Sequence, residues 1–168
     1  MRKTRTKRIV DQQEFHRLTR PLLGLPISHV WRGHGSAIFL EIGRLLRRRL
    51  RRTRIGKSKT KMQGQYGVMI EWSWRVERPR SIYFGSWSTE KVIESRLPKL
   101  EGHIVTAIRV EGRLPELVIE LSGGVWIHSF ATSEGQTEWC LFLDRNQSPR
   151  EWLLSRHGKL VKETGRAR

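Results

Sequence analysis

The chain lacks most of the features that assign a sequence to a class directly. Cys140 is the only cysteine among the 168 residues, which excludes an intrachain disulfide and a zinc site built on cysteines. No apolar run approaches the ~18 residues of a membrane-spanning helix, and no apolar signal-peptide core follows the N-terminal MRKTRTKR. We therefore expect a cytoplasmic protein that acts away from membranes.

The motifs of the common enzyme classes are also missing. The sequence contains no phosphate-binding P-loop, no GxSxG nucleophile elbow and no glycine fingerprint for a dinucleotide. The run 114–116, Leu-Pro-Glu, precedes a predicted strand, as in metal-dependent nucleases of the restriction-enzyme kind. No lysine occurs between Lys99 and Lys159 to complete that motif. We predict no catalytic residue, metal or cofactor, and we favour a binding protein over an enzyme.

Acidic residues are absent from one stretch of a strongly basic chain. The 33 Lys and Arg against 16 Asp and Glu give a formal net charge of +17. Residues 44–61 hold ten basic side chains and no acid, whereas residues 62–150 hold ten basic and eleven acidic side chains. A run of like charge repels itself and is typical of an exposed loop or tail. The excess charge therefore belongs to additions rather than to the predicted core.

The basic stretch supplies our candidate binding residues. Lys and Arg neutralise phosphates through charge density more than through fixed geometry, so we predict association with a polyanion, most of all nucleic acid without strong sequence preference. An acidic protein partner, with the chain as an interaction or neutraliser domain, is the alternative. The candidates are Arg44, Arg47, Arg48, Arg49, Arg51, Arg52, Arg54, Lys57, Lys59 and Lys61. Their leucine neighbours permit one or two helical turns, but we predict mainly a loop.

The stretch 66–76, YGVMIEWSWRV, shows a strict period of two. Successive side chains of a strand point to opposite faces, whereas a helix would place the two tryptophans on no common face. We therefore predict one long central strand that buries Trp72 and Trp74 together with Val68 and Ile70. Exposed tryptophans would offer stacking surfaces for bases; the candidates are Trp31, Trp72, Trp74 and Trp87.

Similar alternation recurs along most of the chain, with short turns between the runs. It is present in 27–42 around a glycine-containing loop, in 81–85, in 104–121, in 125–130 and in 138–143. Ser88 or Thr89 begins one short amphipathic helix. We predict a β-rich α+β fold, a mostly antiparallel curved sheet or partly open barrel of about eight strands with one short helix.

Length and charge predict one domain with basic extensions. A chain of 168 residues has the size of one domain with a substantial core. We predict a single β-rich domain over residues 24–160, interrupted by a basic insertion at 44–65. A basic arm at 1–23, partly helical around Phe15, and a basic tail at 161–168 flank it.

Three segments, GLPISHVWRGHGSAIFLE, GVMIEWSWRVE and GRLPELVIELSGGVWIHSF, resemble those of small bacterial proteins of unknown function. The resemblance covers about residues 24–143 and leaves out the basic segments. It implies that 24–143 is the folded unit and that the arms are additions, and it implies no activity.

One polar set leaves an enzymatic alternative open. His29 and His34 lie five residues apart across a predicted turn, and Glu41 and Glu71 lie on neighbouring predicted strands. Such a cluster would suit a metal or acid–base chemistry. Ordinary polar residues on the outer face of a half-buried sheet explain the same pattern, and we favour that interpretation.

Overall fold

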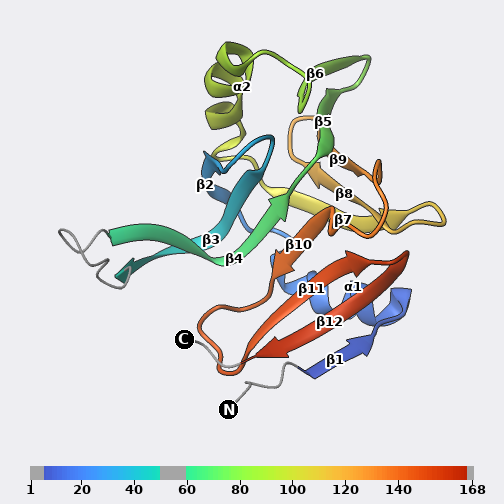
Figure 1. Ribbon diagram of the computed structural model, residues 1–168. Coiled ribbons are helices and arrows are strands. Elements are labelled where there is room, and N and C mark those ends of the chain that lie inside the picture. The colour runs from blue at the N-terminus through green and yellow to red at the C-terminus, as the bar shows by residue number, and fades with distance from the viewer. Residues whose placement is uncertain (1–5, 50–59, 166–168) are drawn as a thin grey trace, which may run out of the picture.

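A computed structural model describes residues 6–49 and 60–165, which form two antiparallel sheets and two short α-helices (Figure 1). The first sheet contains, in spatial order, β1 (Thr6–Ile9), β12 (Lys159–Gly165), β11 (Arg150–Arg156), β10 (Trp139–Phe142), β4 (Thr60–Ile70), β3 (Ile38–Arg49) and β2 (Ile27–Arg32). The second contains β6 (Ser81–Gly85), β5 (Ser73–Arg78), β9 (Val125–Phe130), β8 (Glu116–Leu121) and β7 (Val105–Glu111).

The described part of the chain is therefore β-rich and antiparallel, as predicted, but its strands form two sheets instead of one curved sheet or barrel. The predicted number of strands, about eight, is too low, and there is a second α-helix. The helices are α1 (Gln12–Thr19) and α2 (Glu90–Arg96), each followed by a 3-10 turn, η1 (Arg20–Leu22) and η2 (Leu97–Leu100).

The two sheets are joined at several places. The chain leaves β4 at Ile70 and enters β5 at Ser73, so this connection passes directly from one sheet into the other. The segment before β2 also runs beside β7, where the Gly24 N–H donates to the Val105 carbonyl at 2.8 Å. Inward-facing side chains of both sheets form one apolar core that includes Leu40, Val68 and Ile119.

Trp72 corrects the prediction of a single strand over 66–76. Val68, Ile70 and Trp74 are buried as predicted, but Trp72 is 48% exposed. Its φ of +62° lies in the left-handed region, which breaks the alternation and turns the chain from β4 into β5. Two strands in different sheets therefore replace the predicted long one.

The expected basic arm is part of the packed structure from Thr6 onward. Strand β1 pairs with β12, and α1 buries Phe15 edge-on against Trp139 at 6.2 Å between ring centroids. The Asp11 carboxylate caps α1 by accepting the Glu14 N–H at 2.7 Å. Figure 1 shows α1 behind β11 and β12. An N-terminal helix around Phe15 is confirmed, but the arm is not separate from the sheet.

The expected tail is likewise part of a strand. Residues 150–165 form the β11–β12 hairpin, in which Leu154 pairs with Val161, so β12 includes Val161 to Gly165 of the predicted tail. The turn of this hairpin contains His157 at φ +49° and Gly158 at φ +68°. Both values suit a tight type I′ turn.

The loop conformation expected for the basic insertion at 44–65 is wrong at the two described ends of that segment. Residues up to Arg49 continue β3, and residues from Thr60 onward already belong to β4. Neither a loop nor a helix occupies these described positions. These positions are instead paired as antiparallel strands, from Leu45 opposite Gly64 to Arg49 opposite Thr60.

Candidate nucleic-acid interface

The outer parts of β3 and β4 form a two-stranded ribbon, defined here as residues 45–49 and 60–64. β2 pairs with β3 only between Ile38 and Ile42, and β10 pairs with β4 only between Gly67 and Ile70. Beyond these limits β3 and β4 pair with each other alone, up to Arg49 opposite Thr60. Figure 1 shows this ribbon projecting from the sheet.

Two glycines at the base of the ribbon explain how it departs from the sheet. The register shifts between Ile42 and Leu45, and Gly43 has φ +76°, the geometry of a bulge that needs glycine in the left-handed region. Across from the bulge, a Cβ on Gly64 would lie 2.5 Å from the Ile42 nitrogen. Only glycine fits there, and a bulge increases local twist, which directs the ribbon away from its neighbours.

A buried ion pair holds the base of the ribbon. Arg145 Nη1 donates to Glu41 Oε2 at 2.5 Å, and both side chains are buried. The same Glu41 oxygen accepts the Gly64 N–H at 2.8 Å, and Glu41 Oε1 accepts the Trp31 indole N–H at 3.1 Å. Buried charges persist when they are paired and hydrogen-bonded. Glu41 therefore links β2, β3, β4 and the loop that follows β10.

Arg145 completes the edge of β4 that β10 leaves uncovered. Its Nη1 donates to the Gly64 carbonyl at 3.0 Å, and its backbone N–H donates to the Gln65 carbonyl at 2.9 Å. A Cβ on Gly67 would lie 2.4 Å from Arg145 Nη2, so a larger residue there would displace the guanidinium from its position across the strand. Burial lowers the pKa of Arg145, and the Glu41 carboxylate opposes that shift.

An aromatic pair lies beside this base. Trp31 and Phe39 are cross-strand partners, and their rings stack at 3.8 Å between centroids. Lys61 Nζ lies 3.2 Å from the centroid of the Trp31 ring, a cation–π contact. Partial burial lowers the pKa of Lys61, while the Glu41 carboxylate favours its charged form.

The ten predicted basic residues lie in four different settings. Arg44 and Arg47 are exposed, whereas Arg48 and Lys61 are half-buried; Arg48 Nη2 donates to the Arg145 carbonyl at 2.6 Å. Arg49 ends β3. The other five lie outside the described residues: Arg51, Arg52, Arg54, Lys57 and Lys59.

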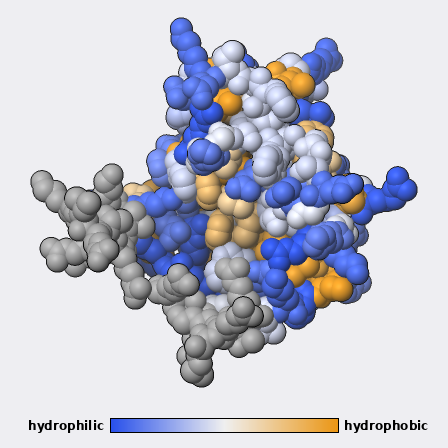
Figure 2. Space-filling view, in the orientation of Figure 1, coloured by the Kyte–Doolittle hydropathy of each residue, from blue (hydrophilic) through white to orange (hydrophobic). Residues whose placement is uncertain are grey.

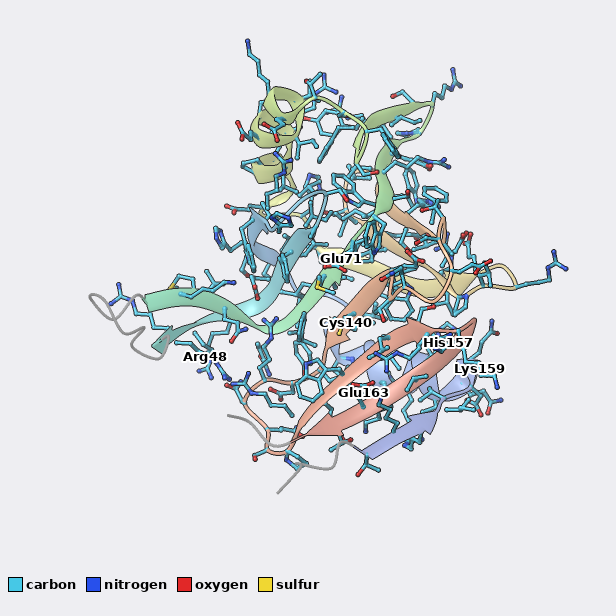
Figure 3. All side chains as sticks on the ribbon, in the orientation of Figure 1. Arg48, Glu71, Cys140, His157, Lys159 and Glu163 are labelled. Carbon is cyan, nitrogen blue, oxygen red and sulfur yellow. The ribbon has the colours of Figure 1, made fainter. Side chains whose placement is uncertain are left out.

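Both faces of the ribbon carry positive charge. Arg48 pairs with Lys61 and Arg47 pairs with Met62, and because directly opposed residues share a face, Arg47 points away from the other two. Within residues 6–49 and 60–165, no carboxylate forms an ion pair with Arg44, Arg47, Arg48 or Lys61. Figure 3 shows Arg48 on the ribbon, distant from Glu163 on β12.

The structure does not bring the His/Glu set together as one site. His29 Nδ1 lies 2.9 Å from Glu101 Oε1, while Glu41 is engaged by Arg145. Glu71 follows β4 at the end remote from the ribbon, and its N–H donates to the Glu138 carbonyl. The described residues include no group of three or more His, Cys, Asp or Glu that could hold a metal ion.

Sequence reasoning missed Arg145, the side chain that organises the base of the ribbon. It stands in a predicted turn after β10 and is separated from Glu41 by more than a hundred positions, so no local pattern connects them. The glycines at 43, 64 and 67 were the available signal, because glycines inside a strand pattern indicate bulges or close approach.

Comparison of the chain with protein-family models, with curated proteins and with solved structures found no match. Among the described residues, neither helix has the length and apolar character needed to cross a membrane. The geometry of the ribbon and its base is therefore the ground for assigning a function.

Proposed function

We propose that this chain binds nucleic acid by holding the phosphate backbone with the basic ribbon, without strong preference for base sequence. The observation that carries the proposal is the position of the charge. Arg44 and Arg47 are exposed at the base and on one face of a projecting ribbon, and no described carboxylate neutralises them. Phosphates would displace the counterions that such unpaired cations otherwise hold.

The shape of the ribbon suits a nucleic-acid groove. The major groove of B-DNA is about 12 Å wide and admits a two-stranded β-ribbon. Arg48 and Lys61 lie on the face that contacts the Arg145 carbonyl and the Trp31 ring. Arg47 lies on the opposite, exposed face, so an inserted ribbon would present this cation to the phosphates. The described ribbon offers the charge needed for backbone contacts, and its arginines carry no acidic neighbours that would repel phosphate.

The buried base makes the ribbon a preorganised element. Glu41, Arg145 and the Trp31 indole are joined by hydrogen bonds, and Arg48 is fixed to the Arg145 carbonyl. A binding element that is already ordered loses less conformational entropy when it meets its ligand. The buried ion pair therefore favours binding even though it contributes no free charge itself.

Two double variants with equal loss of charge test the proposal. Arg44→Gln/Arg47→Gln removes two cations at the ribbon, and Arg80→Gln/Arg113→Gln removes two exposed cations from turns of the second sheet. Duplex DNA affinity is measured at several salt concentrations, together with the melting temperature. Each lost phosphate contact lowers the magnitude of the slope of log affinity against log salt concentration by about 0.9. We therefore expect the DNA affinity and this slope to decrease clearly for the first variant only.

Equal weakening by the two double variants would contradict a localised interface and indicate diffuse charge instead. A wild-type chain that binds neither DNA nor RNA at low salt would refute the proposal outright. In that case an acidic protein is the remaining polyanion, and the Arg44/Arg47 variant then tests that partner.

A further inference from the structure

A second surface, remote from the ribbon, has the chemistry of a ring-binding pocket. A hollow of about 350 Å³ lies between Trp72 and Trp87, and its other lining residues carry five hydroxyl groups and the Gln136 amide. Among the residues that the structure describes, no charged one lines it. Pockets that bind small rings combine aromatic walls with a few polar groups that fix orientation.

Both tryptophans are unusually accessible. Trp87 is 92% exposed and Trp72 is 48% exposed, although tryptophan is highly buried on average. Trp87 lies in a turn that two reciprocal hydrogen bonds between Gly85 and Ser88 hold together. The Ser88 backbone N–H donates to the Gly85 carbonyl, and the Gly85 backbone N–H donates to Ser88 Oγ, each at 3.0 Å. The turn therefore holds the indole out toward solvent.

Trp72 is exposed by a left-handed backbone conformation, which glycine adopts far more easily than tryptophan. Its φ of +62° is uncommon for a residue with a side chain. Ser36 Oγ donates to the Trp72 carbonyl at 2.9 Å, and the Ser36 carbonyl accepts the Trp74 indole N–H at 2.7 Å. Such outliers persist where the surroundings determine them, and they concentrate at functional sites.

The polar lining leaves groups available to a ligand. The Ser73 and Thr132 hydroxyls hydrogen-bond to each other, and Ser86 Oγ accepts the Trp74 backbone N–H. In the part of the chain that the structure describes, the side chains of Ser133 and Gln136 make no hydrogen bond. An amide offers both donors and an acceptor, which matches the edge of a nucleobase.

We propose that the Trp72–Trp87 hollow binds an unpaired nucleobase, which stacks on the indoles and pairs its edge with Gln136. This inference rests on the proposed function, because the neutral hollow takes the base while the ribbon takes the phosphates. Bases in a duplex are already stacked and paired, so only a single strand or an extruded base can enter. The chain therefore binds single-stranded nucleic acid more tightly than the ribbon alone would.

The two sites lie at opposite ends of β4. At a rise of about 3.3 Å per residue, the ten steps from Lys61 to Glu71 span up to about 33 Å. Figure 3 shows Arg48, the partner of Lys61, and Glu71 far apart. A single strand long enough to reach both sites gains from their linkage, and a shorter one does not.

The test compares an oligothymidylate with a duplex of the same number of nucleotides per strand. Both are long enough to span more than about 35 Å, which exceeds the separation of the two sites along β4. Trp87→Ala removes an indole at the tip of a turn, and Trp72→Gly removes the other while relieving the positive φ. Each change should lower single-strand affinity by roughly 5- to 150-fold, the range for one stacked base, with duplex affinity and melting temperature retained. Trp87→Phe should keep most of the affinity.

The control is Ile82→Ala, which removes another exposed apolar side chain, one that does not line the hollow; it should leave both affinities unchanged. Equal losses on single strand and duplex, or no loss on either, would overturn the inference while leaving the ribbon variants to judge the proposed function. Quenching of tryptophan fluorescence by free thymidine, absent in Trp87→Ala, supports the base. Quenching by a disaccharide but not by thymidine overturns it.

Discussion

The exposed arginines at the ribbon differ in their partners from two arginines on the strands of the five-stranded sheet. In the sheet, Arg109 lies between Glu111 and Glu120, and Arg75 pairs with Glu77. Arg44 at the base of the ribbon and Arg47 on it have no acidic partner among the described residues. Arg75 and Arg109 are thus neutralised within the fold, whereas Arg44 and Arg47 are left available.

This difference shows where the charge of the chain is used. Exposed ion pairs contribute little to stability, about 0–1 kcal/mol, so the paired arginines of the sheet chiefly prevent excess charge there. Unpaired cations on a projecting element add repulsion and no stability. Figure 2 shows hydrophilic residues over the ribbon side and a hydrophobic area over the β10–β12 side of the same face. The ribbon is thus distinguished by charge that the fold itself does not need.

The largest expected effect concerns the junction of the two sheets. Trp74 is 2% exposed, packs edge-on against Phe84 and donates its indole N–H to the Ser36 carbonyl. Trp74→Ala should lower the free energy of unfolding by about 3–5 kcal/mol, as for other large core truncations. Urea denaturation measures this, and DNA affinity below the melting transition should remain. A variant that melts like wild type but loses binding would assign Trp74 to the ligand.

A second variant breaks the base of the ribbon. Glu41→Gln leaves the buried Arg145 without its counter-ion, which should cost about 3 kcal/mol because an unpaired buried charge is strongly unfavourable. Glu41→Leu combined with Arg145→Met should recover much of that loss, since an apolar pair can replace a buried ion pair. Denaturation of the single and double variants measures the coupling. Additive losses would mean that the pair does not hold the base.

The smallest effect is expected in the five-stranded sheet. Arg109→Gln removes a partly exposed cation between two carboxylates, and it should change the free energy of unfolding by less than about 1 kcal/mol. DNA affinity should not fall, because Arg109 is neutralised in the folded chain. A loss of binding as large as that of a ribbon arginine would remove the contrast between the two regions.

Much of the fold follows from the sequence because period two is a local signal. The alternation in 125–130 and the Ser122-Gly123-Gly124 turn correctly predict β9 and its hairpin with β8. The turn at His157 and Gly158 was missed because His-Gly is not among the Asn-Gly, Asp-Gly and Gly-Gly pairs that usually indicate a type I′ turn. Trp72 was misassigned because nothing local indicates that one tryptophan leaves the alternation.

For the candidate site, the sequence predicted which basic residues take part but not the structure that they form. Charge density identified the basic stretch, but like-charge repulsion favoured a loop over strands. Pairing between β3 and β4, the Gly43 bulge and the Glu41–Arg145 contact are tertiary features that override that local preference. The exposed Trp72–Trp87 hollow likewise depends on four segments of the chain meeting in space.

Shortening the ribbon tests most directly whether it binds nucleic acid while the rest of the fold stands without it. Leu46 and Gln63 face each other, so an Asn-Gly type I′ turn can replace residues 47–62 and remove nine basic residues. Glu41, Gly64 and Arg145 are retained. We expect a nearly unchanged melting temperature and a loss of DNA affinity of roughly 100-fold or more at moderate salt. A shortened chain that binds DNA as tightly as the full chain, with the same salt slope, would contradict the account.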